Sequence, residues 1–586
     1  MTTARQIWSI LLPRQRRAGM VLFALVLIGT ALETFSVGLV VPALAFMTRG
    51  ASGPSPRLTR WLEWLGNPSS NQLILLVLLL LLGVYAVKSA FLLFVAYWQS
   101  RFVSATQAST SRRLFAIYLA QPWTFHLQRH SAELMRTINE SQDFSQICGV
   151  FLMTISEALV LCGLVGLLLW FEPTGAVVVA GMLAAAAWLF NAIARPRSHR
   201  WATAQRHHAK MIIKHVQQGL GGAKDVKIRG CEQEFLDQFR HHSDGQARMA
   251  ALQSLVHQVP RLWFELLAVA ALLLLTAVMV WQGTPSQRLL PMLGLFATVA
   301  FRMLPSVNHM TSAIHRLRTS EPMLSSLLKE LNLSNATPSG QPTTPMPFRD
   351  SIILENVRFC YPASRENVLD AVNIRIPHGA SVGFVGGSGA GKSTLIDVIL
   401  GLLPPAGGRV TVDGNDIHDN LRGWQDTVGY VSQSIYLCDD SIRRNIAFGV
   451  PEKDIDDGSV KRALKAAQLD AFVASLPDGA DTFVGERGVR LSGGQRQRIG
   501  IARALYHDPE VLVLDEATSA LDGETEKGVM AAVNALHGTK TLIIVAHRLT
   551  TVVDCDTLYR LDKGRIVQSG TFAEVITPEV RPTDAA

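Results

Sequence analysis

Apolar positions divide the 586-residue chain into two regions with different patterns. Up to about residue 320, long apolar runs alternate with polar and basic stretches, whereas later apolar runs are short and bounded by glycines and charges. About 20 apolar residues are enough to cross a bilayer as a helix. The first run is too long for a cleaved signal peptide. The pattern predicts six membrane-spanning segments, at 19–47, 72–98, 146–170, 174–195, 255–282 and 286–316.

Lys and Arg are distributed unevenly between these segments. The stretch up to residue 18 holds four, residues 99–145 hold five and residues 195–254 hold eleven, whereas the three stretches on the opposite side hold four together. Because cytoplasmic loops are enriched in Lys and Arg, both termini and the two long loops are predicted to be cytoplasmic. This placement accounts for much of the net charge of +8 and argues against a nucleic-acid partner.

The two long cytoplasmic loops have helical periodicity in "SRRLFAIYLAQ" and "AKMIIKHVQQGL", so the membrane helices are predicted to extend beyond the lipid. At their ends, "QPWTFHLQRHSAEL" and "GGAKDVKIRG" indicate turns around short helices. These ends either dock on another domain or remain solvated hairpins. In the outer loop, residues 55–66 predict a short amphipathic helix, which lies in the membrane interface or packs on neighbouring protein.

Residues 321–350 are rich in Pro, Ser, Thr and Asn and predict a linker between a membrane domain (1–320) and a second domain (351–586). In the second domain, "GFVGGSGAGKST" follows an apolar strand and fits the phosphate-binding pattern G-x-x-x-x-G-K-[ST]. Glycines let backbone N–H groups surround the phosphates. The pattern assigns Lys392 to the β and γ phosphates and the Ser393 hydroxyl to Mg²⁺.

A second apolar strand, in "VLVLDEATSALD", ends in two acids. Asp515 is predicted to hold Mg²⁺ through water, and Glu516 to act as general base on the attacking water. Helix capping is the structural alternative for this pair of acids. Gln433 in "VGYVSQS" offers an amide to metal and water, and His547 in "IIVAHRL" an imidazole to the γ-phosphate.

Between Gln433 and the acidic pair lies "LSGGQRQR", the signature of the ATP-binding cassette family. The resemblance covers the whole chain, since six crossings followed by one cassette resemble an exporter-type half-transporter. It implies an all-α six-helix transmembrane domain followed by an α/β P-loop cassette domain. It also implies that Tyr361 stacks on adenine, that Asp522 joins the two sites of a dimer, and that Ser492 and Gly494 close over ATP held by the partner.

By this resemblance, ATP and Mg²⁺ are the cofactors and a second copy is the expected partner, with a heterodimer as the alternative. A homodimer is favoured because every catalytic group is present. The catalytic residues are Glu516, His547 and Gln433, and the metal ligands are Ser393, Gln433 and Asp515. The nucleotide-binding residues are Tyr361, Gly386, Gly387, Ser388, Gly389, Ala390, Gly391, Lys392, Ser393, Thr394, Ser492, Gly493, Gly494, Gln495 and Asp522.

Charged residues inside the membrane segments bear on the transported substrate. Lys88 and Arg261 are predicted near the cytoplasmic leaflet, where they either bind an anion or extend to the headgroups. Arg302 lies deeper, with no acid within a turn of its own helix and with Pro305 three residues later. We therefore expect Arg302 to be an unpaired cation that faces a wet cavity and meets an anionic headgroup.

Several less specific stretches, at 31–44, 55–66, 125–134, 219–230 and 301–306, resemble the flippases of lipid-linked oligosaccharides. The expected function is ATP-driven export or flipping of an amphipathic, anionic lipid or lipid-linked glycan. The expected location is the bacterial inner membrane, with the cassette in the cytoplasm. A multidrug or peptide exporter of the same architecture is the alternative, and a cassette-gated channel or regulator is a more distant one.

Overall fold

The computed structural model separates into two compact units. The membrane unit comprises residues 1–119 and 131–334, and the cassette unit comprises residues 120–130 and 335–586. The structure describes residues 3–40, 43, 70–129, 131–171, 173–281, 286–333, 344–362, 364, 366–485, 488–517, 523–546 and 548–576.

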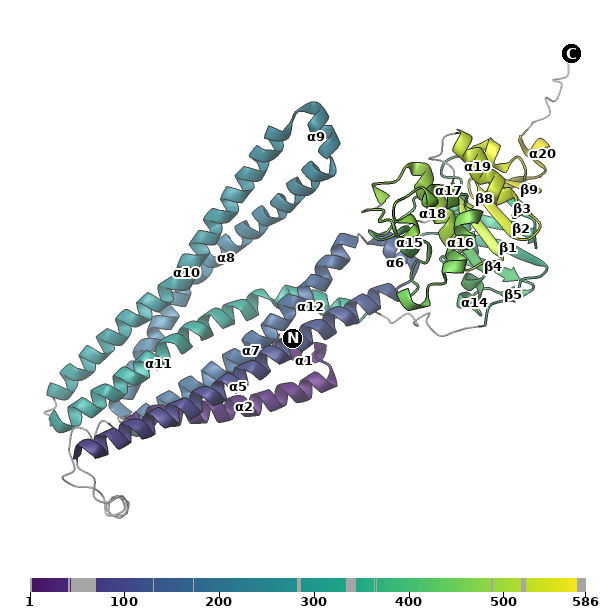
Figure 1. The fold of residues 1–586 in the computed structure, drawn as a ribbon. Coiled ribbons are helices and arrows are strands. Elements are labelled where there is room, and N and C mark those ends of the chain that lie inside the picture. The colour runs from purple at the N-terminus through teal and green to yellow at the C-terminus, as the bar shows by residue number, and fades with distance from the viewer. Residues whose placement is uncertain are drawn as a thin grey trace. The chain divides into compact units, whose positions relative to one another are not determined.

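Six long helices make up most of the membrane unit, and each overlaps one predicted membrane segment (Figure 1). Within the described residues, α2, α5 and α7 contain stretches that are long and apolar enough to cross a bilayer. The helices are α2 (Pro13–Gly38), α5 (Ser70–Leu119), α7 (Ser131–Phe171), α8 (Pro173–Gly221), α10 (Glu232–Trp281) and α11 (Ser286–Thr319).

The helices α5, α8 and α10 extend well beyond a bilayer. They contain 50, 49 and 50 residues, which correspond to about 75 Å each against a hydrocarbon core of about 30 Å. The predicted extensions are therefore confirmed. Helices α8 and α10 pack along each other and are joined by the short helix α9 (Ala223–Arg229), which ends at Gly230 with a φ of +62°.

The predicted linker begins later than residue 321. Residues Glu321–Leu331 form helix α12, because Leu324, Leu327 and Leu331 share one apolar face and are buried. Helix α12 packs against the N-terminal helix α1 (Thr3–Ile10). The Gln6 side chain of α1 donates a hydrogen bond of 3.1 Å to the Ser325 hydroxyl of α12. The first part of the expected linker thus belongs to the membrane unit.

Two sheets form the cassette unit. An antiparallel four-stranded sheet has the order β2-β1-β4-β5, and a mixed six-stranded sheet has the order β10-β9-β3-β8-β7-β6, with β6, β7, β8, β3 and β9 parallel. The strands are β1 (Ser351–Phe359), β2 (Leu369–Pro377), β3 (Ser381–Gly386), β4 (Gly407–Val412), β5 (Asn415–Asp416), β6 (Val428–Val431), β7 (Val511–Asp515), β8 (Thr541–Val545), β9 (Thr557–Asp562) and β10 (Arg565–Gly570).

Short helices cover these sheets and bury apolar side chains in two clusters. Strands β3, β7 and β8 are buried on both faces, which explains why the sequence shows them as continuous apolar runs. The helices are α13 (Lys392–Ile399), α14 (Leu421–Asp426), α15 (Ile442–Ile446), α16 (Asp457–Ala466), α17 (Asp470–Ala474), α18 (Gly493–Leu505), α19 (Gly523–Asn534) and α20 (Phe572–Ile576).

Helix α6 (Trp123–Gln128), at the end of the first cytoplasmic loop, groups with the cassette unit and not with the membrane helices that flank it. The Trp123 side chain donates a hydrogen bond to the Asp397 carboxylate on α13. Of the two alternatives for this loop end, docking on another domain is the one that the contacts favour.

Candidate functional site

The predicted phosphate loop lies between β3 and α13. Gly389 and Gly391 adopt φ values of +77° and +102°, which L-residues with side chains rarely adopt. A Cβ at Gly391 would lie only 2.9 Å from the Val368 carbonyl oxygen, so the loop needs glycine there for space as well. The loop leads directly into the N-terminus of α13, where free backbone N–H groups attract anions.

Lys392, the first residue of α13, is almost fully buried. Its Nζ donates hydrogen bonds to the carbonyl oxygens of Gly386 (3.0 Å) and Gly387 (3.1 Å), so the ammonium group lies directly against the loop. The Tyr361 hydroxyl lies 3.1 Å from the Thr394 hydroxyl. This contact places the tyrosine beside the start of α13, and its stacking on adenine remains a prediction.

Two of the predicted catalytic residues, Gln433 and Glu516, are in contact. Strands β6 and β7 are parallel neighbours, so the segments that follow them lie at the same edge of the sheet. Gln433 Nε2 donates a 2.6 Å hydrogen bond to Glu516 Oε2, and the Glu516 side chain is buried. Glu516 also has a φ of +51°, a left-handed conformation that is costly for a residue with a Cβ. The Glu516 backbone N–H donates a hydrogen bond of 3.0 Å to the Val545 carbonyl oxygen.

Asp515, the last residue of β7, lies in a cluster that sequence reasoning did not identify. The Tyr430 hydroxyl of β6 donates to Asp515. Asp397 on α13 lies within electrostatic range of Asp515. Burial, and then the charge of Asp515, raise the pKa of Asp397 to about 6. Asp397 lies outside the predicted motifs, and Tyr430, although within "VGYVSQS", was assigned no role. Their proximity to Asp515 follows from the packing of α13 and β6 against β7.

Three oxygen-bearing side chains predicted to hold Mg²⁺ come from neighbouring elements: Ser393 from α13, Gln433 after β6 and Asp515 from β7. Magnesium prefers oxygen ligands, and the hydrogen bond from Gln433 Nε2 to Glu516 leaves the amide oxygen of Gln433 for a metal ion. The residues present therefore fit the ion.

The signature segment forms a capped helix start. The Ser492 hydroxyl accepts a hydrogen bond from the Gln495 backbone N–H at 3.2 Å, and the Gln495 side chain accepts one from the Ser492 backbone N–H at 2.8 Å. This reciprocal capping fixes the N-terminus of α18 and leaves Ser492 exposed.

Four of the predicted features lie outside the described residues: His547, Asp522, the outer helix 55–66 and the Arg261 side chain.

In the membrane unit, the expectation that Arg302 is unpaired is wrong. Its guanidinium forms an ion pair with Glu33 of α2, a carboxylate that is only 5% exposed. Arg302 Nη1 also lies 3.3 Å from the Ser306 hydroxyl. The expectation rested on the absence of an acid within one turn of the same helix, whereas the acidic partner of Arg302 is on another helix. Lys88 on α5 lies within electrostatic range of both Glu33 and Arg302.

Two family models match the chain. The model described as ABC transporter transmembrane region matches residues 18–303, and the model described as ABC transporter matches residues 369–519. The matched ranges contain the six long helices, except for the start of α2 and the end of α11, and they contain the phosphate loop, signature and acidic pair of the cassette.

Similar proteins agree with these matches. A protein of Cupriavidus pinatubonensis named ATP-dependent lipid A-core flippase is 31% identical over 79% of this chain and 79% of its own length. Proteins of the same name from Ralstonia nicotianae (30% identity, 85% and 84% coverage) and Cupriavidus metallidurans (28%, 98% and 94%) are also similar.

A solved structure shares the fold. A bacterial Atm1-family ABC exporter with ATP bound superposes with a TM-score of 0.73 at 22% identity, over 95% of both chains. The predicted fold class, a helical transmembrane domain followed by an α/β nucleotide-binding domain, is confirmed. The chain therefore belongs to the ABC transporter family, as an exporter-type membrane protein that couples ATP hydrolysis to transport.

Proposed function

We propose that this chain acts as a homodimer in the bacterial inner membrane and uses ATP to flip an anionic, amphipathic lipid out of the inner leaflet. Three charged residues of the membrane unit support the substrate part of the proposal: Glu33 and Arg302, which form an ion pair, and Lys88, which lies within electrostatic range of both. The names of the similar proteins, which specify a lipid A-core flippase, support a lipid substrate.

Arg302 and Lys88 contribute one positive charge each to this group, and Glu33 contributes one negative charge. Glu157 of α7 adds a second carboxylate within electrostatic range of Arg302, so an anion has to replace a carboxylate at the guanidinium. A phosphate on a lipid headgroup is an anion of this kind. It would compete with the Glu33 carboxylate for the planar guanidinium of Arg302, which matches phosphate and carboxylate geometry equally well. Arg261 stays a predicted member of this site, without a described side chain.

In the cassette, the proposed roles follow from the contacts. The ammonium of Lys392 neutralises phosphate charge, and Gln433 orients Glu516, whose carboxylate accepts a proton from the attacking water. Ser393, Gln433 and Asp515 would hold Mg²⁺, which would supply neutralisation of phosphate charge.

A dimer is proposed because one cassette lacks part of the composite site implied by the signature. Ser492 is exposed at the capped start of α18, where a second copy can approach it. The α8–α10 pair also exposes apolar side chains near α9 that a second copy could cover: Ile213, Leu220, Ile228 and Leu236.

The test is a substrate panel with the purified protein in liposomes. Two fluorescent lipids with identical acyl chains, one with a phosphate headgroup and one with a neutral headgroup, separate charge from hydrophobicity. We expect ATP-dependent transfer between leaflets and stimulated ATP hydrolysis for the anionic lipid. If amphipathic drugs or peptides stimulate hydrolysis and neither lipid is moved, the multidrug or peptide alternative replaces the proposal.

A further inference from the structure

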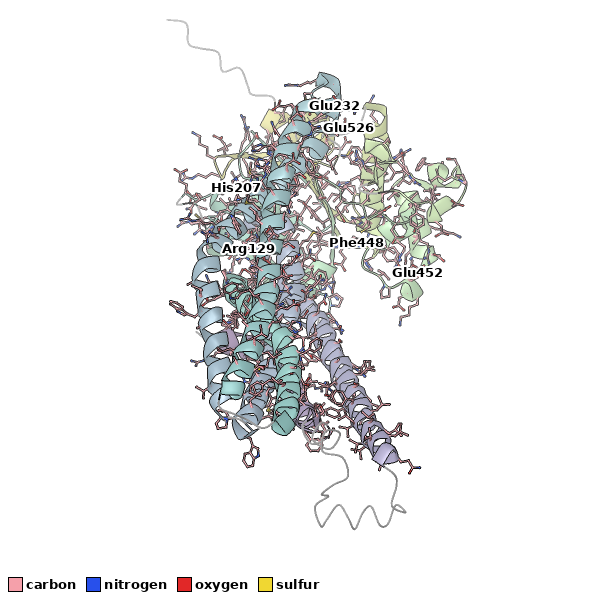
Figure 2. The ribbon with its side chains drawn as sticks, turned by 90° about the vertical axis from the view of Figure 1, so that its left-hand side faces the viewer. Arg129, His207, Glu232, Phe448, Glu452 and Glu526 are labelled. Atoms are coloured by element: carbon pink, nitrogen blue, oxygen red, sulfur yellow. The ribbon has the colours of Figure 1, made fainter. Side chains whose placement is uncertain are left out.

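Five histidines gather between α8 and α10, and none of them belongs to the ATP site or to the group of membrane charges. The chain has 16 histidines in all, so nearly a third lie in this one place. Figure 2 labels His207 on the long helical pair, whose two members pack along each other. We call this set the His cluster: His207, His208 and His215 on α8, and His241 and His242 on α10.

His242 is the centre of the cluster. Its Nδ1 lies 3.0 Å from the Nδ1 of His208, and the two ring centroids are 5.3 Å apart. On its other side, the ring of His215 stacks on His242 with a centroid distance of 5.4 Å and an angle of 16° between the planes. His208 and His215 are seven residues apart, so they occupy one face of α8, two turns from each other.

The backbone of α10 makes room for this arrangement. A Cβ at Gly245 would lie 2.5 Å from Cε1 of His208 and 2.8 Å from each of its ring nitrogens. The imidazole of His208 therefore lies directly on the α10 backbone, in a space that any residue with a side chain would fill. In addition, the Nδ1 of His215 is buried and has no hydrogen-bond partner among the described residues.

We propose that the His cluster binds a divalent transition-metal ion, with His208 and His242 as two ligands and His215 as the third. Imidazole nitrogens bind Zn²⁺ at about 2.0–2.1 Å. Two nitrogens 3.0 Å apart can both reach one ion at that distance. As positioned, no three donors among the described residues already meet at one point, so His215 turns about its side-chain torsions to complete the set.

The donor type of the cluster indicates which ion it fits. Metal ions bind the neutral form of imidazole. Imidazole ligands suit Zn²⁺, Cu²⁺ and Ni²⁺. An ion held by both helices would tie α8 to α10 along the extension that carries α9.

The experiment titrates Zn²⁺ into the full-length protein by calorimetry, after removal of any histidine tag and treatment with a chelator. We expect one ion per chain, and binding that weakens as the pH falls from 7.5 to 5.5, because protons compete for the imidazoles. His208→Asn with His242→Asn should weaken binding at least about 10-fold, the lower end of the cost of removing only a supporting residue of a metal site. His418→Asn, an exposed histidine of the cassette, is the control and should leave binding unchanged.

Two further measurements test metal binding by the His cluster even if the double variant folds poorly. Gly245→Ala keeps every histidine but displaces the His208 ring, so it should also weaken Zn²⁺ binding. Electron paramagnetic resonance of bound Cu²⁺ should show coupling to imidazole nitrogens, which the double variant loses. The proposal is overturned if Zn²⁺ binds equally well to the wild type, the double variant and Gly245→Ala, or if chelator-treated wild type binds no Zn²⁺.

Discussion

At the scale of single residues, the contact between Gln433 and Glu516 has the most direct chemical consequence. Glu516→Gln keeps the size of the side chain but removes the carboxylate that we propose as the proton acceptor. We expect ATP to bind normally and hydrolysis to slow by about 100-fold or more, the range for a lost general base. Binding of a fluorescent ATP analogue and release of phosphate measure the two effects separately.

Lys392→Ala serves as the contrasting variant, because it removes charge from the phosphate loop and should weaken nucleotide binding itself. Hydrolysis near the wild-type rate in Glu516→Gln would remove Glu516 from the role of general base.

A second residue-scale prediction concerns the ion pair between Glu33 and Arg302. Removing Arg302 alone would leave Glu33 buried without its partner, which costs stability. The informative comparison is therefore between Glu33→Gln and the double variant Glu33→Gln, Arg302→Leu. We expect Glu33→Gln to bind the anionic lipid more tightly than wild type, because the guanidinium no longer has the Glu33 carboxylate as a competing partner.

The double variant should bind the anionic lipid about 10- to 150-fold more weakly than Glu33→Gln, the equivalent of a charge-assisted contact of about 1.5–3 kcal/mol. Affinity is measured by titrating the lipid into protein in nanodiscs, with the neutral lipid as control. Equal affinities for all three proteins would show that Arg302 only holds α2 and α11 together.

These residues differ in how far the sequence could predict them. Gln433 and Glu516 stand in short motifs at strand ends, so chain-local patterns identify them, and parallel strands then bring them together. Glu33 and Arg302 are 269 positions apart, and no local pattern indicates that their helices place them in contact. Asp397 lies outside the predicted motifs and Tyr430 was assigned no role, so their proximity to Asp515 emerges only from packing.

At the scale of secondary-structure elements, α6, α13 and β7 meet through Asp397. Its raised pKa, about 6 against an ordinary value of 3.8, means that the folded protein binds this proton more tightly than the unfolded chain. Asp397 therefore destabilises the fold progressively as the pH rises from about 4 to 6, and the full cost is present above pH 6.

Asp397→Asn mimics the protonated acid and should remove that cost. We expect the unfolding temperature of the full-length protein to rise by a few degrees at pH 7.5, and the difference from wild type to shrink as the pH falls towards 4. Thermal unfolding followed by intrinsic fluorescence measures it. Asp419→Asn, at an exposed position, is the control, and an equal effect of both substitutions would contradict the assignment.

Elements were predictable where their apolar pattern was strong. The long helices and the buried strands β3, β7 and β8 appear in the sequence as continuous or periodic apolar runs. Helix α12 was not predicted. Its short apolar face of Leu324, Leu327 and Leu331 adjoins a stretch rich in Pro, Ser, Thr and Asn that indicated a linker, and the helix α1 that covers this face is more than 300 residues away in the sequence.

At the scale of the whole molecule, the proposal that each ATP site combines residues of two chains can be tested with dimers of two different variants. Lys392→Ala damages the phosphate loop, and Ser492→Arg damages the signature, so each homodimer should lose both sites. In a mixed dimer, one site combines both lesions and the other combines two intact halves. We expect co-expression to restore one occluded nucleotide per dimer, measured as ADP trapped with vanadate after purification on two affinity tags.

Failure of the mixed dimer to occlude ATP, with both chains folded and paired, would contradict shared sites. Recovery of two trapped nucleotides per dimer would contradict shared sites as well.

The sequence could predict the architecture of the chain, since charge bias and motif order cover its full length. The pairing of two chains could not be seen in one sequence, because the completing surface belongs to another copy.

The left-handed backbone of Glu516 has a consequence for evolution and engineering. A residue with a Cβ is held there at a cost of about 1–3 kcal/mol, and glycine would relieve that strain. The proposed general base therefore occupies a position at which a substitution that relieves backbone strain would remove activity. A library selected only for heat resistance should accumulate Gly at position 516, so thermostable but inactive chains are the expected result unless transport is selected as well.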